Sequence, residues 1–109
     1  MGGGDGRSEV LTLANYRPHI NRTIVFEGRV VRLLKKQSRP EWALMFENLP
    51  WKEGLKLVIC PEHLVAAGGE DNLRDLVGKR IRVRGLLEKH YREGYRIVVN
   101  DPQAILRVE

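Results

Sequence analysis

The sequence predicts an all-β domain with one short helix, in the order β-β-β-α-β-β, and three observations lead to this prediction. First, apolar residues alternate with arginines over residues 79–88, as in a strand with one buried face. Second, the apolar parity changes within residues 22–36, beside Gly28, as in a long strand that bends. Third, a proline and a glycine pair bracket a short helix in residues 61–69. A first strand that bends and serves two sheets is what a small closed barrel needs.

The chain begins with a glycine-rich stretch. We expect residues 1–9 to form a disordered tail and residues 10–109 to form a single domain. Residues 10–21 are expected to form a short irregular or helical lead-in, because Pro18 does not suit a long helix. Asn21 is well placed for a left-handed residue immediately before the first strand.

The first half of the domain contains three predicted strands, joined by a basic loop at residues 35–41 and a tight turn at residues 50–54. In the second strand, alternate apolar residues beginning at Trp42 predict a buried face. In the third strand, the parity predicts that Lys56 and Val58 face outward. The three strands are expected at residues 22–36, 42–49 and 55–60.

The second half contains the helix and two further strands. Pro61 suits the first helical position, and Gly78 is expected to end the helical region before the fourth strand. Gly94 suits a left-handed residue in the hairpin that joins the fourth and fifth strands. Helical turns are expected at residues 61–67 and 72–77, the fourth strand from residue 79, the fifth at 95–100, and a closing extended segment at 104–108.

The net charge of +5 is distributed unevenly along the 109 residues. Residues 22–39 contain six Lys and Arg against one acidic residue, and residues 79–96 contain seven against two. Residues 40–78 between them contain three against seven. If the fold brings the two basic blocks together, they form a basic stripe of the kind that binds nucleic acid.

Several classes of site are excluded by composition. Cys60 is the single cysteine, so an intrachain disulfide is impossible. The three histidines are too scattered for a zinc site, and we expect no metal and no cofactor. No run approaches the roughly 20 apolar residues of a membrane span, and the N-terminus lacks the apolar core of a secretory signal. We therefore expect a cytoplasmic or other reducing intracellular location, and no membrane partner.

The second half of the chain carries a pattern more specific than strand periodicity. Its elements are residues 76–85 (LVGKRIRVRG), Tyr91, Gly94, residues 97–99 (IVV) and residues 102–105 (PQAI). This pattern resembles the C-terminal half of OB-fold nucleic-acid-binding domains of the bacterial tRNA-anticodon-like type, and residues 27–31 (EGRVV) resemble their first strand. The resemblance covers roughly residues 20–108. It implies a five-stranded Greek-key barrel, with a helix between strands three and four, whose face and two loops commonly bind oligonucleotides or oligosaccharides.

The candidate binding residues lie mainly in the two loops that flank the usual OB cleft. Cations in these loops would pair with phosphates, and Tyr91 would stack on a base, which is worth roughly 1–3 kcal/mol. We expect the hairpin tip to face the first loop. The loop candidates are Lys35, Lys36 and Arg39 in the first loop and Lys89, Tyr91 and Arg92 in the hairpin.

The other candidates lie on the outward faces of strands or in a turn, and each has a structural alternative. They are Lys56, Arg82 and Arg84, with Trp51 as a candidate stacking residue. The arginines, which share a parity with Arg80, either line the groove or form a solvated face paired with the acidic middle block. Trp51 either stacks on a base or caps the end of the barrel.

These features predict a non-catalytic protein that binds single-stranded DNA or RNA. The alternative is an adaptor that binds another protein within a replication, repair or RNA-processing assembly. The nuclease activity known on related barrels requires paired carboxylates for a metal, but no Asp occurs between Arg7 and Asp71. No nucleophile paired with a base is visible either, so we expect no enzyme.

Overall fold

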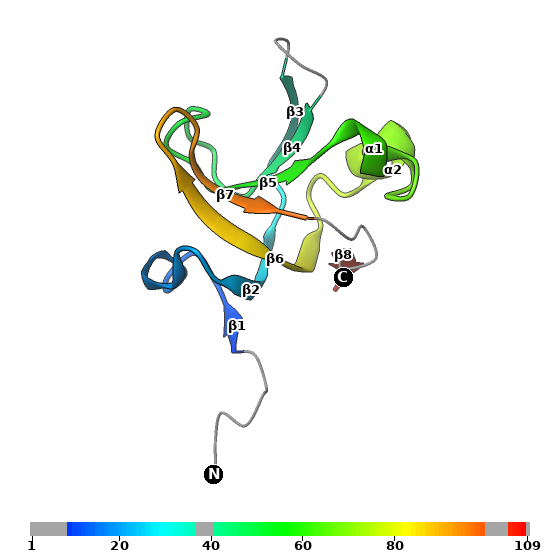
Figure 1. Ribbon diagram of the computed structural model, residues 1–109. Coiled ribbons are helices and arrows are strands. Elements are labelled where there is room, and N and C mark those ends of the chain that lie inside the picture. Colours follow the sequence, from blue (N-terminus) through cyan, green and yellow to red (C-terminus); the bar gives the residue numbers. More distant parts are fainter. Residues whose placement is uncertain (1–8, 37–40, 100–104, 109) are drawn as a thin grey trace.

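The computed structural model describes residues 9–36, 41–99 and 105–108, although the side chains of Lys36 and Arg107 are not described (Figure 1). The predicted tail therefore lies outside the described residues except for Glu9, and the loop residue Arg39 lies outside them as well. The strands are β1 (Val10–Leu11), β2 (Thr23–Arg29), β3 (Arg32–Lys36), β4 (Glu41–Met45), β5 (Lys56–Ile59), β6 (Arg80–His90), β7 (Gly94–Val98) and β8 (Ile105–Arg107). The helices are the 3-10 helix η1 (Arg17–His19), α1 (Pro61–Leu64) and α2 (Gly69–Asp75).

The strands form one mixed sheet with the order β1-β2-β6-β7-β5-β4-β3, and β8 pairs with β6 beside this path. β1 runs parallel to β2, and β5 runs parallel to β7, whereas the other pairs are antiparallel. This mostly β arrangement is compatible with an OB-like fold. It differs from the prediction in strand number, which is eight rather than five in the described residues, and in the hydrogen-bonded path, which does not close into a ring.

The predicted bend in the first strand is confirmed, and the bend divides this strand into β2 and β3. Val30 donates its backbone N–H to the carbonyl of Lys79 at 2.9 Å, whereas the N–H of Val31 reaches the carbonyl of Met45 at 2.8 Å. The chain therefore leaves the β6 side of the sheet and joins the β4 side between two consecutive residues. Gly28 allows this bend to pack closely, because a Cβ there would lie 2.8 Å from the Phe26 ring.

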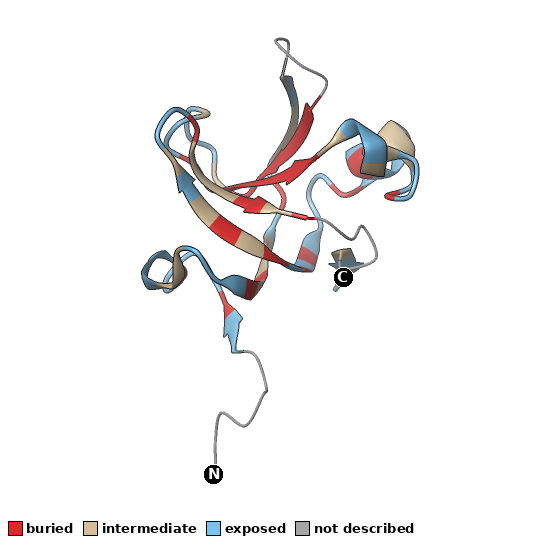
Figure 2. Cartoon of the chain, in the orientation of Figure 1, coloured by how far each residue is buried: buried red, intermediate tan, exposed pale blue. Residues whose placement is uncertain are grey.

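The core fills the space between the two halves of the sheet. The alternating residues of β4, β5 and β6 that were predicted to be buried are buried, as the red segments of Figure 2 show, and Ile97 of β7 joins them. Tyr16 and Leu11 from the lead-in close one part of this core, and Leu73 and Leu76 from the α2 region close another. Burying each such large apolar side chain contributes about 1.5–3 kcal/mol, so the lead-in and the helices are integral to the fold.

The helical region contains two short helices instead of one. Pro61 opens α1 as predicted, and Gly68, with a φ of 95°, separates the two helices. The predicted left-handed residues are also confirmed, since Asn21 has a φ of 69° and Gly94 a φ of 74°. In the described part of the chain, no helix has the length and apolar character needed to span a membrane.

Candidate nucleic-acid interface

The most exposed aromatic group lies at the tip of the β6–β7 hairpin, which we define as residues 89–93. Tyr91 is 84% exposed, and its ring stacks on the His90 ring with centroids 4.9 Å apart. The guanidinium of Arg92 lies 5.2 Å from the centre of the Tyr91 ring. His90 also accepts a hydrogen bond at Nδ1 from the backbone N–H of Arg92. The hairpin tip therefore presents an exposed tyrosine and an exposed cation, with the half-buried His90 ring stacked on the tyrosine.

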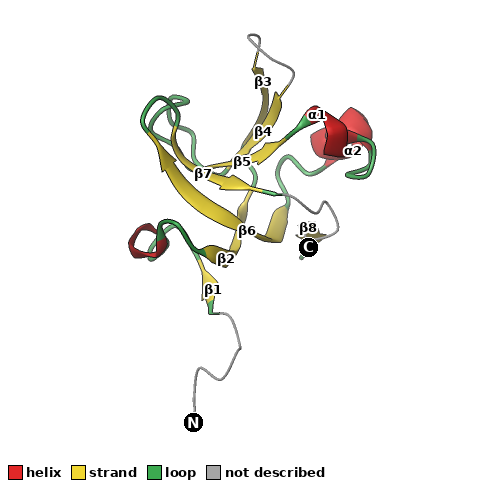
Figure 3. Cartoon of the chain, viewed as in Figure 1, coloured by secondary structure: helices red, strands yellow, loops and turns green. Residues whose placement is uncertain are grey.

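The hairpin tip is held by the turn between β4 and β5, which appears as a neighbouring loop in Figure 3. Lys56 donates hydrogen bonds from Nζ to the backbone carbonyls of Glu93 at 2.5 Å and Tyr95 at 3.2 Å. Gly94 packs against the same turn so closely that a Cβ there would overlap the backbone oxygen of Lys52. A tight contact and two hydrogen bonds thus fix the direction in which Tyr91 projects.

Lys56 was predicted to face outward into solvent, but the structure buries it, and its role as a nucleic-acid ligand stays a prediction. Its side chain is 0% exposed, and its amine lies 5.3 Å from the centre of the Trp51 ring. Burial, reinforced by the positive charge of Arg96 and opposed by Glu47, lowers the pKa of Lys56 to about 8. The prediction of an outward position failed because strand parity does not reveal that the hairpin and the turn cover this part of the sheet.

Two neighbours of Lys56 on the same face of β4 and β5 are also buried. Val58, which was predicted to face outward, is 3% exposed, and Met45, which lies opposite Lys56, is also buried. Trp51 is half-buried with Lys56 over its ring, and capping of the barrel end stays a prediction. Its stacking on a base remains a prediction.

The arginine row on β6, formed by Arg80, Arg82 and Arg84, is partly neutralised. Arg82 donates to Oε1 of Glu27 at 2.8 and 3.1 Å, and Arg80 lies 3.8 Å from the other oxygen of the same carboxylate. The partner is thus on β2 and not in the acidic middle block. Arg84 is exposed opposite Val25, and no ion pair to it is seen in the described residues. The row carries less free charge than its sequence suggests.

The first basic loop is described only in part. Lys35 is exposed, with its amine 5.0 Å from the centre of the Trp42 ring. It borders a cavity of about 310 Å³ that also contacts Glu70 and Arg74 of α2. Lys35 therefore faces α2 and not the hairpin tip. The side chain of Lys36 and all of Arg39 lie outside the described residues, so whether the loop faces the tip stays a prediction.

One residue that sequence reasoning did not select, Arg17 of η1, lies beside the hairpin tip. Its guanidinium lies 5.5 Å from the centre of the Tyr95 ring, and the amine of the predicted candidate Lys89 lies 5.3 Å from the same centre. Tyr95 is half-buried, which fits its parity with Ile97. Arg17 carried no signal in the sequence, since it lies in an irregular segment far from the hairpin.

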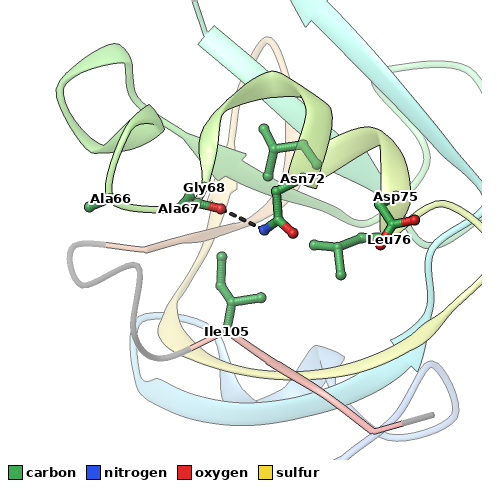
Figure 4. Close-up of a pocket in the computed structure, with 8 residues that line it drawn as sticks. Ala66, Ala67, Gly68, Asn72, Asp75, Leu76 and Ile105 are labelled. Atoms are coloured by element: carbon green, nitrogen blue, oxygen red, sulfur yellow. Dashed lines mark hydrogen bonds between the residues drawn. The ribbon is translucent and has the colours of Figure 1, made fainter.

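A second cavity, of about 500 Å³, lies between α2 and β8 (Figure 4). Leu73, Leu76 and Ile105 contribute apolar surface to it, and Asn72 donates from Nδ2 to the carbonyl of Ala67 at 2.7 Å at its edge. Among the described residues that line it there is no cation. In the described residues, no group of three His, Cys, Asp or Glu side chains is arranged to hold a metal ion.

Comparison with known proteins supports the fold. No protein-family model matches the chain, and no curated protein sequence matches it. A structure described as an aspartyl-tRNA synthetase from Leishmania major Friedlin matches 99% of this chain with a TM-score of 0.58 and 10% identity. RecG bound to a three-way DNA junction matches 94% of it with a TM-score of 0.57 and 16% identity. The matches cover 22% and 13% of those longer chains. The chain thus shares a fold with parts of two proteins whose descriptions refer to nucleic acid.

Proposed function

We propose that this chain is a non-catalytic OB-fold protein that binds single-stranded DNA or RNA through the tip of the β6–β7 hairpin. The observation that carries the proposal is the Tyr91 ring, which is exposed and accompanied by His90 and Arg92. An exposed aromatic ring with a cation beside it suits an unpaired base with its phosphate, because the ring stacks on the base and the cation attracts the anion. In a duplex the bases are already stacked on one another, so we expect preference for single strands.

The arrangement of the sheet supports the same proposal. β2 and β3 are consecutive in the chain, and they lie near opposite ends of the hydrogen-bonded path. We infer that they are two parts of one bent strand, so that the sheet corresponds to the five-stranded OB barrel with β1 and β8 added. In that fold the β6–β7 hairpin is one of the two loops that border the binding cleft. Similarity to parts of two proteins related to nucleic acid adds weight to this assignment.

Fluorescence anisotropy with labelled single-stranded oligonucleotides tests the proposal. We expect binding at about 50 mM salt that weakens steeply as salt rises, because phosphate contacts release counterions. Tyr91→Ala should weaken binding by roughly tenfold to a hundredfold, the equivalent of one stacked base. Val65→Ala is the matched control, since Val65 is 86% exposed but lies in the helical region. Absence of binding at low salt, or equal binding by Tyr91→Ala and the wild type, would refute the proposal.

The alternative function, an adaptor that binds another protein, is favoured by one observation. On the sheet face beside the hairpin tip, Arg96 is neutralised by Glu88 and Glu93, with contacts of 2.9 Å to each. A neutralised face suits a protein surface better than a polyanion. The two functions differ in salt dependence, and an adaptor alone predicts no affinity for oligonucleotides at low salt.

A further inference from the structure

We propose that the lead-in segment before β2 is part of the nucleic-acid site, and that Arg17 and Lys89 together bind one backbone phosphate across the ring of Tyr95. This inference rests on the proposed function and extends it to a second contact point beside the Tyr91 stack. It assigns a binding role to η1, which lies outside the region in which the sequence resembles OB-fold domains.

Tyr95 holds the two cations in position. The Lys89 amine and the Arg17 guanidinium lie 5.3 and 5.5 Å from the centre of its ring. The ring in turn meets Tyr16 edge-to-face, with centroids 5.4 Å apart and an interplanar angle of 90°. Tyr16 is buried against Phe26. A ring fixed by the core therefore supports two cations that have separate origins in the chain.

The backbone ties η1 to the hairpin end of β6. Asn21 donates its N–H to the carbonyl of Leu87 at 2.7 Å, and Leu87 donates back to the carbonyl of Arg22 at 2.9 Å. Within η1, His19 donates its N–H to the carbonyl of Tyr16 at 3.1 Å. These bonds connect the lead-in to the strand two residues before Lys89. The position of Arg17 is thus set by the fold, although its side chain is exposed.

The charge at this point remains available for a ligand. Neither Arg17 nor Lys89 forms an ion pair with a carboxylate in the described residues. The nearby carboxylates have other partners: Glu88 and Glu93 contact Arg96, and Oε1 of Glu47 accepts the N–H of Leu55. A cation over a ring at an exposed site gains only about 0.5–1 kcal/mol. Arg17 also donates from Nε to the Tyr16 hydroxyl at 3.5 Å, which leaves the terminal N–H groups of its guanidinium for an anion.

A phosphodiester is the anion that best fits this pair. A guanidinium binds two phosphate oxygens at once, and an ammonium neutralises the same group as a point charge. Lys89 directly precedes His90 in the chain, so a phosphate held here would adjoin a base stacked on Tyr91. A bound strand would then continue from the hairpin tip toward η1.

Oligonucleotide titrations of Arg17→Gln, Lys89→Gln and the double variant, between about 50 and 200 mM salt, test the inference. Each single change should weaken binding about three- to tenfold and lower the slope of log K against log salt by no more than about 0.7, the value for one single-strand phosphate. If both cations share one phosphate, the double variant will weaken binding by less than the product of the two single effects. Arg17→Lys and Lys89→Arg should keep most of the affinity.

Arg74→Gln is the charge-matched control, because Arg74 lies on α2 and pairs with Glu70. Thermal unfolding followed by circular dichroism should show that all variants remain folded. If the wild type binds but Arg17→Gln and Lys89→Gln titrate like the wild type, this inference fails and the proposed function stands. If the loss of affinity in the double variant equals the product of the two single losses, Arg17 and Lys89 do not bind the same phosphate. Failure of the wild type to bind would remove both proposals.

Discussion

The two ends of β6 carry similar numbers of cations but place them against different partners. At the first end, Arg80 and Arg82 share the carboxylate of Glu27. At the hairpin end, Lys89 lies over the Tyr95 ring, and just beyond the strand Arg92 lies over Tyr91. A carboxylate cancels the charge of its partner at a distance, whereas an aromatic ring leaves the net charge unchanged. The comparison shows that a basic stretch of sequence keeps its net positive charge only where its partners are uncharged.

The largest expected effect concerns what holds the hairpin end in place. Gly94→Ala should lower the free energy of unfolding by about 3 kcal/mol, because the residue has a φ of 74° and the new Cβ would overlap the backbone of Lys52. Gly78→Ala is the matched control, since its φ is 88° but a Cβ there meets no atom within 4 Å. It should lose only about 1 kcal/mol, from the left-handed conformation alone. Denaturant unfolding measures both, and equal losses would mean that the hairpin is not fixed by this turn.

The next largest effect concerns Lys56, whose amine donates hydrogen bonds to two backbone carbonyls of the hairpin. Its pKa in the folded protein is about 8, below the ordinary value of 10.5. Below pH 8 the amine is protonated in both the folded and the unfolded chain, so the folded chain bears the full cost of burying the charge. Between pH 8 and pH 10.5 the unfolded chain binds a proton that the folded chain does not, so the free energy of unfolding rises with pH. The free energy of unfolding of the wild type, measured relative to that of Lys56→Met, should therefore increase by about 2 kcal/mol between pH 8 and pH 10.

Chemical denaturation at several pH values gives this difference directly. The raised pKa of Tyr16, which burial causes, affects both proteins equally and cancels. Lys56→Met also removes the hydrogen bond from Lys56 to the carbonyl of Glu93, which adds a loss of about 1–3 kcal/mol that does not vary with pH. Lys52→Met, at an exposed lysine of the same turn, should show no such pH dependence. A difference that is constant from pH 7 to pH 10 would show that the amine is not desolvated.

Periodicity and turn chemistry were sufficient to predict most of the fold. The alternation in β6, the parity change at Val30 and Val31, and the left-handed Asn21 and Gly94 are local signals, and each is confirmed. The segment at residues 104–108 was predicted to extend the sheet, and β8 lies within it. The additional strand β1 was not predicted, because it is two residues long and its own sequence contains too few alternating positions to indicate it.

The candidate site was less predictable, because its properties depend on contacts between segments that are distant in sequence. Parity placed Lys56 on the outer face of its strand, but only the packing of the hairpin on the turn decides that this face is buried. Parity likewise found the arginine row without its neutralising partner, since Glu27 lies 55 residues from Arg82. Arg17 was missed for the same reason, because its position depends on the hydrogen bonds between Asn21 and Leu87.

Removing the carboxylate at the first end of β6 should make the two ends more alike. Glu27→Gln keeps an acceptor of similar size but leaves the charges of Arg80 and Arg82 uncompensated. We expect affinity for single strands at low salt to rise about two- to fivefold. The slope of log K against log salt should steepen by up to about 0.7 for each phosphate newly contacted. Glu70→Gln, which frees Arg74 on α2, is the control and should leave oligonucleotide binding unchanged. Unchanged binding by Glu27→Gln would place the arginine row outside the path of the strand.

The smallest effect is expected when an arginine of the row is replaced while Glu27 is kept. Arg82 is 46% exposed and already paired, so Arg82→Gln should lower the free energy of unfolding by less than about 1 kcal/mol. Its affinity for oligonucleotides should change less than twofold, whereas Arg92→Gln, which removes an equal charge from the hairpin tip, should lose several-fold. Parallel anisotropy titrations of the two variants measure this contrast. If Arg82→Gln weakens binding as much as Arg92→Gln does, the ion pair with Glu27 must open on the nucleic acid, and the binding surface extends along the whole of β6.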